Sequence, residues 1–545
     1  MCGIVGFVKK NQEDVSGYID EMLESIKHRG PDAQNYYSNN NVTLGHTRLS
    51  IVDIENGHQP YIFKNYVLVF NGEIYNHEKL KIELENKGYS FETNSDTEVL
   101  VKLYDCYGDS FTDKLRGMYA FVILDKDKKE LTMSRDFFGI KPMYIYQNDE
   151  ELFFSSEMIT LIRLLKKSNV DYKINVEAQK EYLKNDFIKN HNIVKNAFEL
   201  PKGKVFRYKD NKLTEVRTTK YYFDVNRMEL SQILKEEIEE QQNADVDVGV
   251  LLSGGIDSSL ITSYACENKS KVNTYSISFE DDEMYDESKY SREVAEKFNT
   301  NHREFKFSEE TLLNYLPQLI ETIDIPVYDP AMLPMLYLCE NVSKTSKVVL
   351  SGDGGDEMFL GYTHHRILKY RKIFKLLSNL GIKKNIISTI LIKKKNLEES
   401  KNNDQDTGLN LQLLRKTDLC SMRYGVEVRV PFLSKRVYSY SKSKNNLKFI
   451  NLFYGKLPLR ELARKRINKT IAYKKKQGFR VPIKEWVNNG VLGEKIVASL
   501  TSDLVISSEV ISKFDISKML AKKDVYYKEL FSLYLLNCWL IKIKF

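Results

Sequence analysis

The sequence predicts two folded units in one chain: an α+β domain followed by an α/β domain with a parallel sheet and many helices. Three observations predict this arrangement. The 545 residues are too many for one ordinary hydrophobic core. Short alternating apolar runs separated by turn residues fill the first part of the chain, as expected of strands in stacked sheets. A near-continuous apolar run at 246–252 that leads into a glycine-rich loop is typical of a buried parallel strand.

Composition and charge indicate a globular chain that binds neither nucleic acid nor a membrane. Hydrophobic residues make up 42% and charged residues 29%, and a net charge of +7 is small for this length. No apolar run reaches membrane-spanning length, and no basic stretch precedes the amino-terminal apolar residues as in a signal peptide. The six cysteines lie far apart without a CxxC pair, which indicates neither a cysteine-based zinc site nor a disulfide framework. We therefore expect a cytoplasmic protein.

The first domain is expected at residues 1–208. Its predicted strands lie at 4–8, 42–46, 66–70, 119–124, 131–134 and 152–155. Its predicted helices lie at 15–27, at 78–87 and near 97–107. Sheet layers with helices outside them form an α+β domain.

Cys2 is the most informative residue of this domain. Removal of Met1 would leave Cys2 with a thiol and a free α-amine on the same carbon. An α-amine titrates near ~8, so it can accept a proton near neutral pH, and the thiolate is the species that attacks. Cys2 could therefore supply both a nucleophile and its base. Taken alone, a small residue beside the start codon is the simpler interpretation.

Polar clusters downstream of Cys2 favour the chemical interpretation. Each one alone would be a turn, a helix cap or an ion pair. Together they meet the requirements for hydrolysing the side-chain amide of glutamine. Arg48 can bind the α-carboxylate, and Asp96 can pair with the α-ammonium. The Asn71 side chain and the Gly72 N–H can form an oxyanion hole, because a glycine lets its backbone approach closely.

The first domain resembles the glutaminase domain of class II (amino-terminal nucleophile, or Ntn) glutamine amidotransferases. The motifs that carry the resemblance are Cys2-Gly3-Ile4, Arg29-Gly30-Pro31-Asp32, Arg48-Leu49-Ser50-Ile51-Val52-Asp53, Asn71-Gly72-Glu73-Ile74-Tyr75-Asn76 and Ser95-Asp96. The resemblance implies an Ntn-hydrolase sandwich of two sheets between helix layers (αββα). It also implies the roles proposed above and a place for Glu73 in the same glutamine-binding pocket.

The second domain is expected at residues 225–545, after a polar junction at 209–224. A predicted helix at 231–241 and the strand at 246–252 lead into Ser253-Gly254-Gly255-Ile256-Asp257-Ser258-Ser259 and an apolar helix through residue 265. Backbone N–H groups of such a loop, together with the positive end of the helix, bind anions. The loop has neither the lysine of a Walker motif nor the spacing of a dinucleotide fingerprint. It resembles the pyrophosphate-binding loop of enzymes that split ATP into AMP and pyrophosphate.

A second glycine-rich loop, Ser351-Gly352-Asp353-Gly354-Gly355-Asp356-Glu357, follows a predicted strand at 347–350. Its three carboxylates repel one another unless a cation or a proton relieves them. Loops at the carboxyl ends of parallel strands are where α/β sheets bind ligands. We therefore predict that Asp257 and Asp356 hold Mg²⁺ and that Asp353 orients the reacting carboxylate or acts on ammonia. Lys476 is a candidate for neutralising the departing pyrophosphate.

These motifs, with Gly425-Val426-Glu427-Val428-Arg429-Val430-Pro431-Phe432-Leu433 and Lys476-Gln477-Gly478-Phe479, resemble the synthetase domain of glutamine-dependent asparagine synthetases. The resemblance covers almost the whole chain. It implies that ATP activates aspartate as β-aspartyl-AMP and that ammonia released at Cys2 crosses an internal tunnel to displace AMP. The residues it assigns to ATP or pyrophosphate are Leu252, Ser253, Gly254, Gly255, Asp257, Ser258, Ser259, Ser278, Ser351, Gly352 and Lys476.

Three departures from the family pattern leave the acceptor open. Asp353 stands where glutamate is usual, Ser434 where aspartate is common, and Leu360 where a second glycine is common. Such departures are similar to those of relatives that amidate other carboxylates, including uronic acids of surface polysaccharides. The expected partners are therefore glutamine, ATP and either aspartate or another carboxylate, with a homodimer left open. The lysine- and asparagine-rich segment 362–406 is expected to be a helical excursion with a loop.

Overall fold

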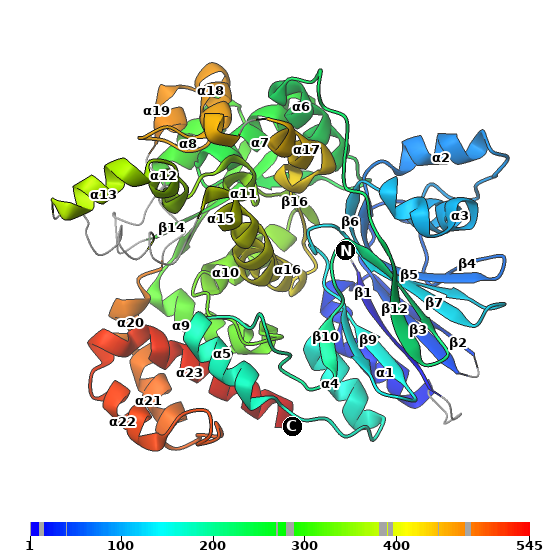
Figure 1. The fold of residues 1–545 in the computed structure, drawn as a ribbon, viewed down its shortest axis with the longest axis horizontal. Helices are drawn as coiled ribbons and strands as arrows, with labels where there is room; N and C mark the ends of the chain where they lie inside the picture. Colours follow the sequence, from blue (N-terminus) through cyan, green and yellow to red (C-terminus); the bar gives the residue numbers. More distant parts are fainter. Residues whose placement is uncertain are drawn as a thin grey trace.

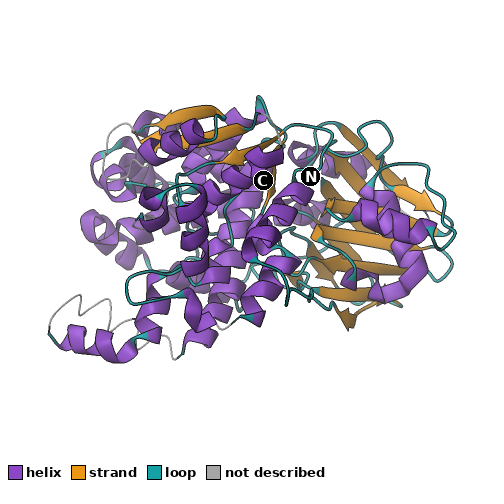
Figure 2. Cartoon of the chain, turned by 90° about the horizontal axis from the view of Figure 1, so that it is seen from above, coloured by secondary structure: helices purple, strands orange, loops and turns teal. Residues whose placement is uncertain are grey.

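The computed structural model describes residues 2–9, 16–39, 41–268, 271–279, 288–380, 390, 396–444, 446–474 and 481–544. A strand-rich amino-terminal half lies beside a helix-rich carboxyl-terminal half (Figures 1 and 2). Within the described part of the chain, no helix is both long enough and apolar enough to cross a bilayer.

Two antiparallel six-stranded sheets form the amino-terminal half. The first runs, in spatial order, through β10 (Ala197–Glu199), β8 (Tyr144–Gln147), β9 (Leu152–Ser155), β1 (Gly3–Val8), β3 (Val42–Arg48) and β2 (Ala33–Ser38). The second runs through β12 (Lys212–Thr218), β11 (Lys204–Lys209), β7 (Glu130–Arg135), β6 (Gly117–Asp125), β5 (Tyr66–Ile74) and β4 (Tyr61–Phe63).

Apolar side chains on both faces of each sheet produce the layered sandwich. Between the sheets, Ile4 and Leu44 of the first contact Val69 and Val122 of the second in one buried cluster. Helices α1 (Ser16–Ser25) and α4 (Met158–Lys167) cover the outer face of the first sheet. Helices α2 (His77–Glu85) and α3 (Asp96–Tyr107) cover the outer face of the second. The predicted αββα arrangement is confirmed.

The six strands expected in this half are all present, but other strands were missed. Strand β12 carries almost no buried side chain, and β2 is mostly exposed, so neither shows the apolar alternation that predicts a strand. Strand β12 lies inside the segment 209–224 expected to be a junction, and the chain leaves the sheet only after Thr218. The domain boundaries themselves stay a prediction.

A five-stranded parallel sheet lies at the centre of the carboxyl-terminal half. Its spatial order is β15 (Asn301–Phe307), β14 (Asn273–Phe279), β13 (Val248–Leu251), β16 (Val348–Leu350) and β17 (Glu427–Arg429). The first strand in the sequence, β13, lies between β14 and β16, so the strand order changes direction there. Such a switch point opens a crevice at the carboxyl ends of its strands. The two glycine-rich loops follow β13 and β16 and therefore meet at this crevice.

Helices cover both faces of the parallel sheet and extend beyond it. Helices that contact its strands are α7 (Ile256–Asn268), α8 (Ser288–Lys297), α10 (Met332–Ser343) and α16 (Arg415–Met422), and α6 (Leu230–Gln241) packs against α7. The other described α-helices are α5 (Val176–Asn185), α9 (Glu309–Thr322), α11 (Gly355–Phe359), α12 (Thr363–Lys369), α13 (Arg371–Asn379), α15 (Leu397–Asn403), α17 (Lys435–Ser443), α18 (Leu457–Arg466), α19 (Lys469–Tyr473), α20 (Ile483–Asn489), α21 (Val491–Thr501), α22 (Lys513–Leu520) and α23 (Lys523–Lys544). The π-helix η3 (Asp404–Leu414) joins α15 to α16. The helical excursion expected within 362–406 is confirmed in its described parts.

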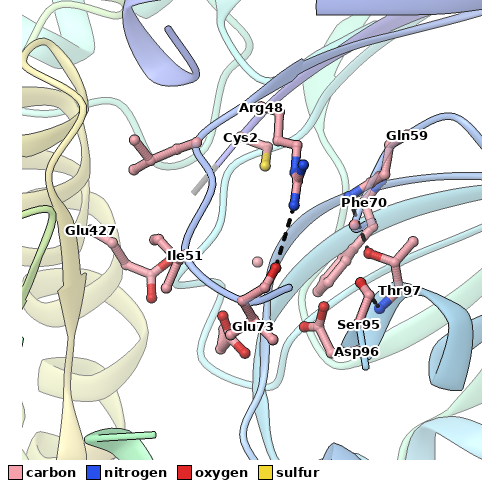
Figure 3. A pocket seen from close by; sticks show the side chains of 14 residues that line it. Cys2, Arg48, Ile51, Gln59, Phe70, Glu73, Ser95, Asp96, Thr97 and Glu427 are labelled. Carbon is pink, nitrogen blue, oxygen red and sulfur yellow. Dashed lines mark hydrogen bonds between the residues drawn. The ribbon is translucent and has the colours of Figure 1, made fainter. Parts of the chain in front are cut away.

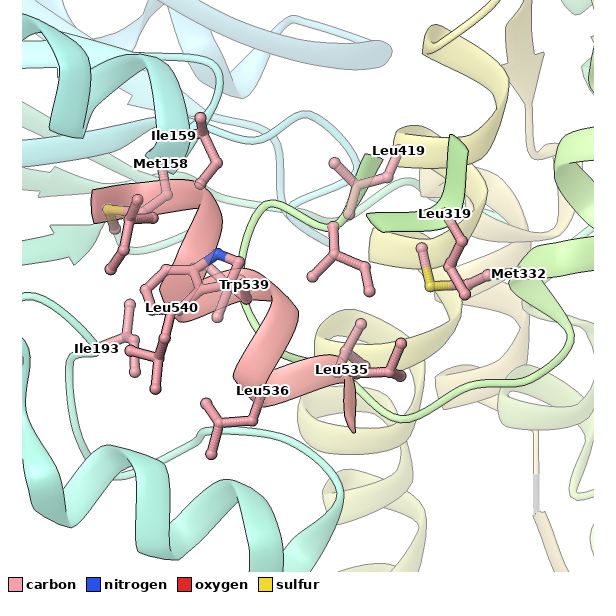
Figure 4. Packing of buried hydrophobic residues seen from close by; sticks show 14 of the residues in the cluster. Met158, Ile159, Ile193, Leu319, Met332, Leu419, Leu535, Leu536, Trp539 and Leu540 are labelled. Atoms are coloured by element: carbon pink, nitrogen blue, oxygen red, sulfur yellow. The ribbon is translucent and has the colours of Figure 1, made fainter. Parts of the chain in front are cut away.

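The carboxyl-terminal helix α23 joins the two halves (Figure 4). Trp539 is buried in one apolar cluster with Met158 and Ile159 of α4 and with Met332 of α10. Its indole N–H donates to the backbone oxygen of Asp324 at 2.9 Å. A shared core of this kind fixes the positions of the two halves relative to each other.

Candidate active sites

The first candidate site is a pocket around Cys2 (Figure 3). Cys2 immediately precedes β1, and the pairing of β1 with β3 places it near the end of β3. A hydrogen bond to Asn71 places it beside β5 of the other sheet. Of the residues predicted to act on glutamine, the pocket is lined by Cys2, Arg48, Gly72, Glu73 and Asp96. The lining also includes Gln59, Ser95 and Thr97 from the amino-terminal half and Glu427 from the carboxyl-terminal half.

The surroundings of Cys2 are suited to a tetrahedral oxyanion. The Cys2 backbone nitrogen donates to Asn71 Oδ1 at 3.2 Å. Asn71 is fully buried, and its Nδ2 has no hydrogen-bond partner among the described residues, so a donor remains for a ligand. A Cβ atom at Gly72 would lie 2.1 Å from the backbone oxygen of Met118, so only glycine fits there. Burial raises the pKa of the Cys2 thiol, so its deprotonation needs a base close by.

Arg48 and Asp96 lie in the pocket but already have protein partners. Arg48 Nη1 donates to the backbone oxygen of Ile54 at 3.0 Å, and Nη2 donates to that of Asp53 at 2.6 Å. Asp96 Oδ2 accepts from the Ile74 backbone nitrogen at 3.0 Å, and burial raises the pKa of the Asp96 carboxyl. These bonds hold both side chains against the pocket wall. Their contact with the glutamine α-carboxylate and α-ammonium stays a prediction.

Sequence reasoning missed a buried ion network that enters this pocket from β17. Arg429 Nη2 donates to Glu73 Oε2 at 3.1 Å, and Arg429 Nε donates to Glu427 Oε1 at 2.6 Å. Arg429 also donates to the backbone oxygens of Gln241 and Asn243, at 2.9 and 2.8 Å.

All three charged side chains of the network are buried. Burial opposes ionisation of the Glu427 carboxyl, but the opposite charge of Arg429 and its hydrogen bond lower the pKa of that carboxyl. The available signal was the alternation Glu427-Val428-Arg429, which puts both charged residues on one face of a buried strand.

The second candidate site lies where the two glycine-rich loops meet. A Cβ at Gly352 would lie 3.0 Å from Asp257 Cβ, and one at Gly355 would lie 2.6 Å from Asp257 Oδ1. The loops are therefore in direct contact. Lys456 Nζ forms ion pairs with Asp257 Oδ2 at 2.5 Å and with Asp356 Oδ1 at 2.7 Å. Burial disfavours the Lys456 ammonium, but the two carboxylates outweigh it and raise its pKa.

The position of the Lys456 ammonium indicates whether Asp257 and Asp356 could bind Mg²⁺. Carboxylates from two different loops converge on one cation, and carboxylate oxygens are the ligands that Mg²⁺ prefers. Asp257 and Asp356 therefore fit the role. Lys456 was missed because it lies 199 residues beyond Asp257 and outside both loops. The predicted cation Lys476 lies outside the described residues.

The other residues predicted to bind ATP lie around the first loop. Leu252 is buried at the end of β13, where its backbone nitrogen donates to the Tyr275 oxygen at 2.8 Å. Ser258 Oγ donates to the Gly255 oxygen at 3.2 Å and lies 3.1 Å from Ser253 Oγ. The hydroxyls of Ser259 and Ser278 are buried, and neither has a hydrogen-bond partner in the part of the chain that the structure describes. The loop is held in shape by its own serines.

Asp353 lies between the crevice and α16. Thr417 Oγ1 donates to Asp353 Oδ2 at 3.0 Å, and burial raises the pKa of the Asp353 carboxyl. Leu360 has a φ of 57°, a left-handed conformation that favours glycine, which explains why glycine is common at this position of the pattern. The next residue, Gly361, has no room for a side chain, because a Cβ there would lie 1.8 Å from Asp356 Oδ1.

Two family models match the chain. A glutamine amidotransferase domain matches residues 1–222, and an asparagine synthase domain matches residues 229–541. Asparagine synthetase [glutamine-hydrolyzing] 1 of Bacillus subtilis (strain 168) is 31% identical over 90% of this chain and 88% of its own length. A putative asparagine synthetase [glutamine-hydrolyzing] 2 of Methanocaldococcus jannaschii is 35% identical, over 70% and 80%. Asparagine synthetase B [glutamine-hydrolyzing] of Escherichia coli (strain K12) is 29% identical, over 80% and 74%.

Among solved structures, the chain aligns with a glutamine phosphoribosylpyrophosphate amidotransferase from B. subtilis complexed with ADP and GMP. The TM-score is 0.31 and the identity 15%, over 65% of this chain and 82% of that chain.

Replacing Arg429 tests the buried ion network. Arg429→Met removes the cation and leaves Glu73 and Glu427 buried without it, so we expect a loss of about 3–5 kcal/mol in the free energy of unfolding. Urea unfolding followed by circular dichroism measures the loss. Adding Glu73→Gln and Glu427→Gln removes the two uncompensated charges and should restore most of it.

Arg464→Met is the matched control. This arginine is exposed and pairs with the exposed Glu461, so its removal should change stability little. Equal losses in the two arginine variants would contradict a structural role for the Arg429 network.

Proposed function

The chain belongs to the family of glutamine-hydrolysing asparagine synthetases, and we propose that it forms asparagine from aspartate, glutamine and ATP through β-aspartyl-AMP. The protein is a carbon–nitrogen ligase with glutamine as amido donor. The observation that carries the proposal is the placement of two chemically distinct sites on neighbouring strands. Glu427 of β17 lines the Cys2 pocket, and β17 pairs with β16, whose carboxyl end leads into the loop containing Asp353 and Asp356.

In the first half-reaction, Cys2 releases ammonia from glutamine. Its α-amine accepts the thiol proton, and the thiolate attacks the side-chain amide. Asn71 Nδ2 and the Gly72 N–H stabilise the oxyanion of the tetrahedral intermediate. Ammonia leaves with a proton returned by the α-amine, and water then hydrolyses the thioester to glutamate. Arg48 and Asp96 hold the two charged groups of glutamine in place.

In the second half-reaction, the crevice between the loops binds ATP. The aspartate β-carboxylate attacks the α-phosphate, pyrophosphate leaves, and ammonia then displaces AMP from the acyl-adenylate. Asp257 and Asp356 would hold Mg²⁺, which neutralises phosphate charge when bound. Lys456 lies beside both carboxylates and supplies positive charge near the departing pyrophosphate. Asp353 orients the reacting carboxylate or accepts a proton from the attacking nitrogen.

The packing between the two halves suggests a route for ammonia inside the protein, along buried apolar side chains. One buried cluster combines Leu49 and Met118 of the amino-terminal half with Val426, Val428 and Val430 around β17. Apolar walls disfavour ammonium, because a charged group loses its hydration there, but they admit neutral ammonia. Nitrogen kept neutral in this way stays nucleophilic.

Aspartate is the acceptor that the comparisons support over a uronic acid, since the relatives named above are asparagine synthetases. Purified protein given glutamine and ATP should form asparagine when aspartate is added. A uronate should not stimulate pyrophosphate release. Asparagine absent under these conditions would refute the proposed acceptor.

Replacing the nucleophile should separate the two half-reactions. In Cys2→Ala we expect glutamine-dependent asparagine formation to fall by at least roughly a thousandfold, because no thiolate attacks the amide. Ammonia-dependent formation should stay within about twofold of wild type. Chromatographic assay of asparagine with each nitrogen source measures both rates. Cys106→Ala, which changes a cysteine outside the pocket, should retain both. Glutaminase activity in Cys2→Ala would show that another residue is the nucleophile.

Replacing Asp257 should affect the other half-reaction alone. Asp257→Asn keeps the shape of the side chain but removes its charge, and we expect AMP formation to fall at least roughly a hundredfold. Basal glutamine hydrolysis at the distant Cys2 pocket should persist. Asp247→Asn, an exposed change just before β13, is the control and should leave AMP formation intact. Normal AMP formation in Asp257→Asn would place the ATP site elsewhere.

A further inference from the structure

A group of possible metal ligands lies outside both sites, where helix α12 meets the start of η3. His364 and His365 belong to α12, and Asp404 begins η3 directly after α15. His364 Nε2 lies 2.5 Å from Asp404 Oδ2, and His365 Nε2 lies 2.9 Å from the same oxygen. The ligand atoms of all three residues lie within 4.8 Å of one another. Two imidazole nitrogens and one carboxylate oxygen therefore converge on one point.

These side chains are largely buried and packed against one another, which favours a preformed binding site over an incidental surface contact. His365 is fully buried, and Asp404 is buried. The two imidazole rings lie 4.4 Å apart between centroids, and the ring of Tyr362 stacks on His364 at 5.4 Å with an interplanar angle of 13°. Fixed rings lose little conformational entropy when a ligand binds. An ordinary pair on this protein, His191 with Glu181, joins one nitrogen to a carboxylate, and its histidine is 43% exposed.

We propose that His364, His365 and Asp404 bind a first-row divalent cation of the zinc class. Imidazole suits Zn²⁺, Co²⁺ and Fe²⁺, whereas Mg²⁺ prefers ligands that are all oxygen. Zinc accepts histidine and carboxylate ligands at about 2.0–2.2 Å, so small side-chain shifts would admit an ion among atoms already this close. This site is separate from Asp257 and Asp356, which are both carboxylates and pair with Lys456.

The position of the site indicates what the ion would do. The ion would tie α12 to the start of η3, two elements separated by the segment 370–403. Tyr362, whose ring stacks on His364, donates its hydroxyl to Glu357, the neighbour of Asp356. A bound ion would therefore hold Tyr362 and, through it, Glu357 at the end of the loop that we propose binds ATP. The ion itself would not contact the reacting atoms.

Metal retention by the full-length chain tests the inference. Protein purified in chelator, incubated with Zn²⁺ alone and desalted should retain one equivalent by atomic absorption, and its thermal midpoint should rise with zinc. Loading with Co²⁺ should give visible ligand-field bands without the near-ultraviolet charge-transfer band of a thiolate. His364→Gln and Asp404→Asn should each weaken zinc binding by at least roughly a hundredfold. His191→Gln should bind zinc as the wild type does.

Two outcomes would overturn the inference. Wild-type protein that retains no zinc would show that both histidines simply donate hydrogen bonds to Asp404. Equal retention by wild type, His364→Gln and Asp404→Asn, or a thiolate band with Co²⁺, would place the ion elsewhere. His364 is partly exposed, so His364→Gln keeps the test valid if Asp404→Asn fails to fold.

Discussion

The arrangement of the two sites depends on the ion pairs that the buried Arg429 guanidinium forms with Glu73 and Glu427. The guanidinium pairs with Glu73 of the amino-terminal half and with Glu427 of its own strand, and both carboxyl groups are buried away from bulk water. Breaking a buried pair is costly because a charge is left without compensation. The halves therefore cannot separate at this point without exposing or protonating these groups. Through Arg429, the network holds Glu73 of the Cys2 pocket against β17, the edge strand of the parallel sheet.

The parallel sheet connects this ion network to the second site, because β17 is hydrogen-bonded to β16. Register pairs Val348 of β16 with Glu427 of β17, and the Ser351 nitrogen donates to the Arg429 oxygen at 2.9 Å. Strand β17, which contributes Glu427 to the Cys2 pocket, is thus hydrogen-bonded to the strand that leads into the Asp353 loop. Helix α23 supplies a second connection through the apolar cluster around Trp539. The two candidate sites are therefore held in one arrangement by backbone hydrogen bonds and by a shared apolar core.

The features that could be predicted are those determined by residues close together in the sequence. Cys2, the two glycine-rich loops and the central strands were predictable because close backbone approach and apolar runs leave direct marks in the sequence. The contacts of Lys456 with Asp257 and of Arg429 with Glu73 were not, since only the fold brings these distant parts of the chain together. Strands β2 and β12 were missed because their side chains are largely exposed. The roles of the site residues toward bound substrates stay predictions for Cys2, Arg48, Asn71, Gly72, Asp96, Asp257, Asp353 and Asp356.

The most direct test of a coupled enzyme follows the fate of the amide nitrogen. Wild-type protein is given ATP, aspartate and glutamine with an isotopically labelled amide, in the presence of excess unlabelled ammonium. Mass spectrometry of the asparagine then measures the labelled fraction. If ammonia passes inside the protein from Cys2 to the acyl-adenylate, nearly all asparagine made from glutamine should carry the label. A labelled fraction that falls to the ratio expected from mixing with the solvent pool would contradict the account.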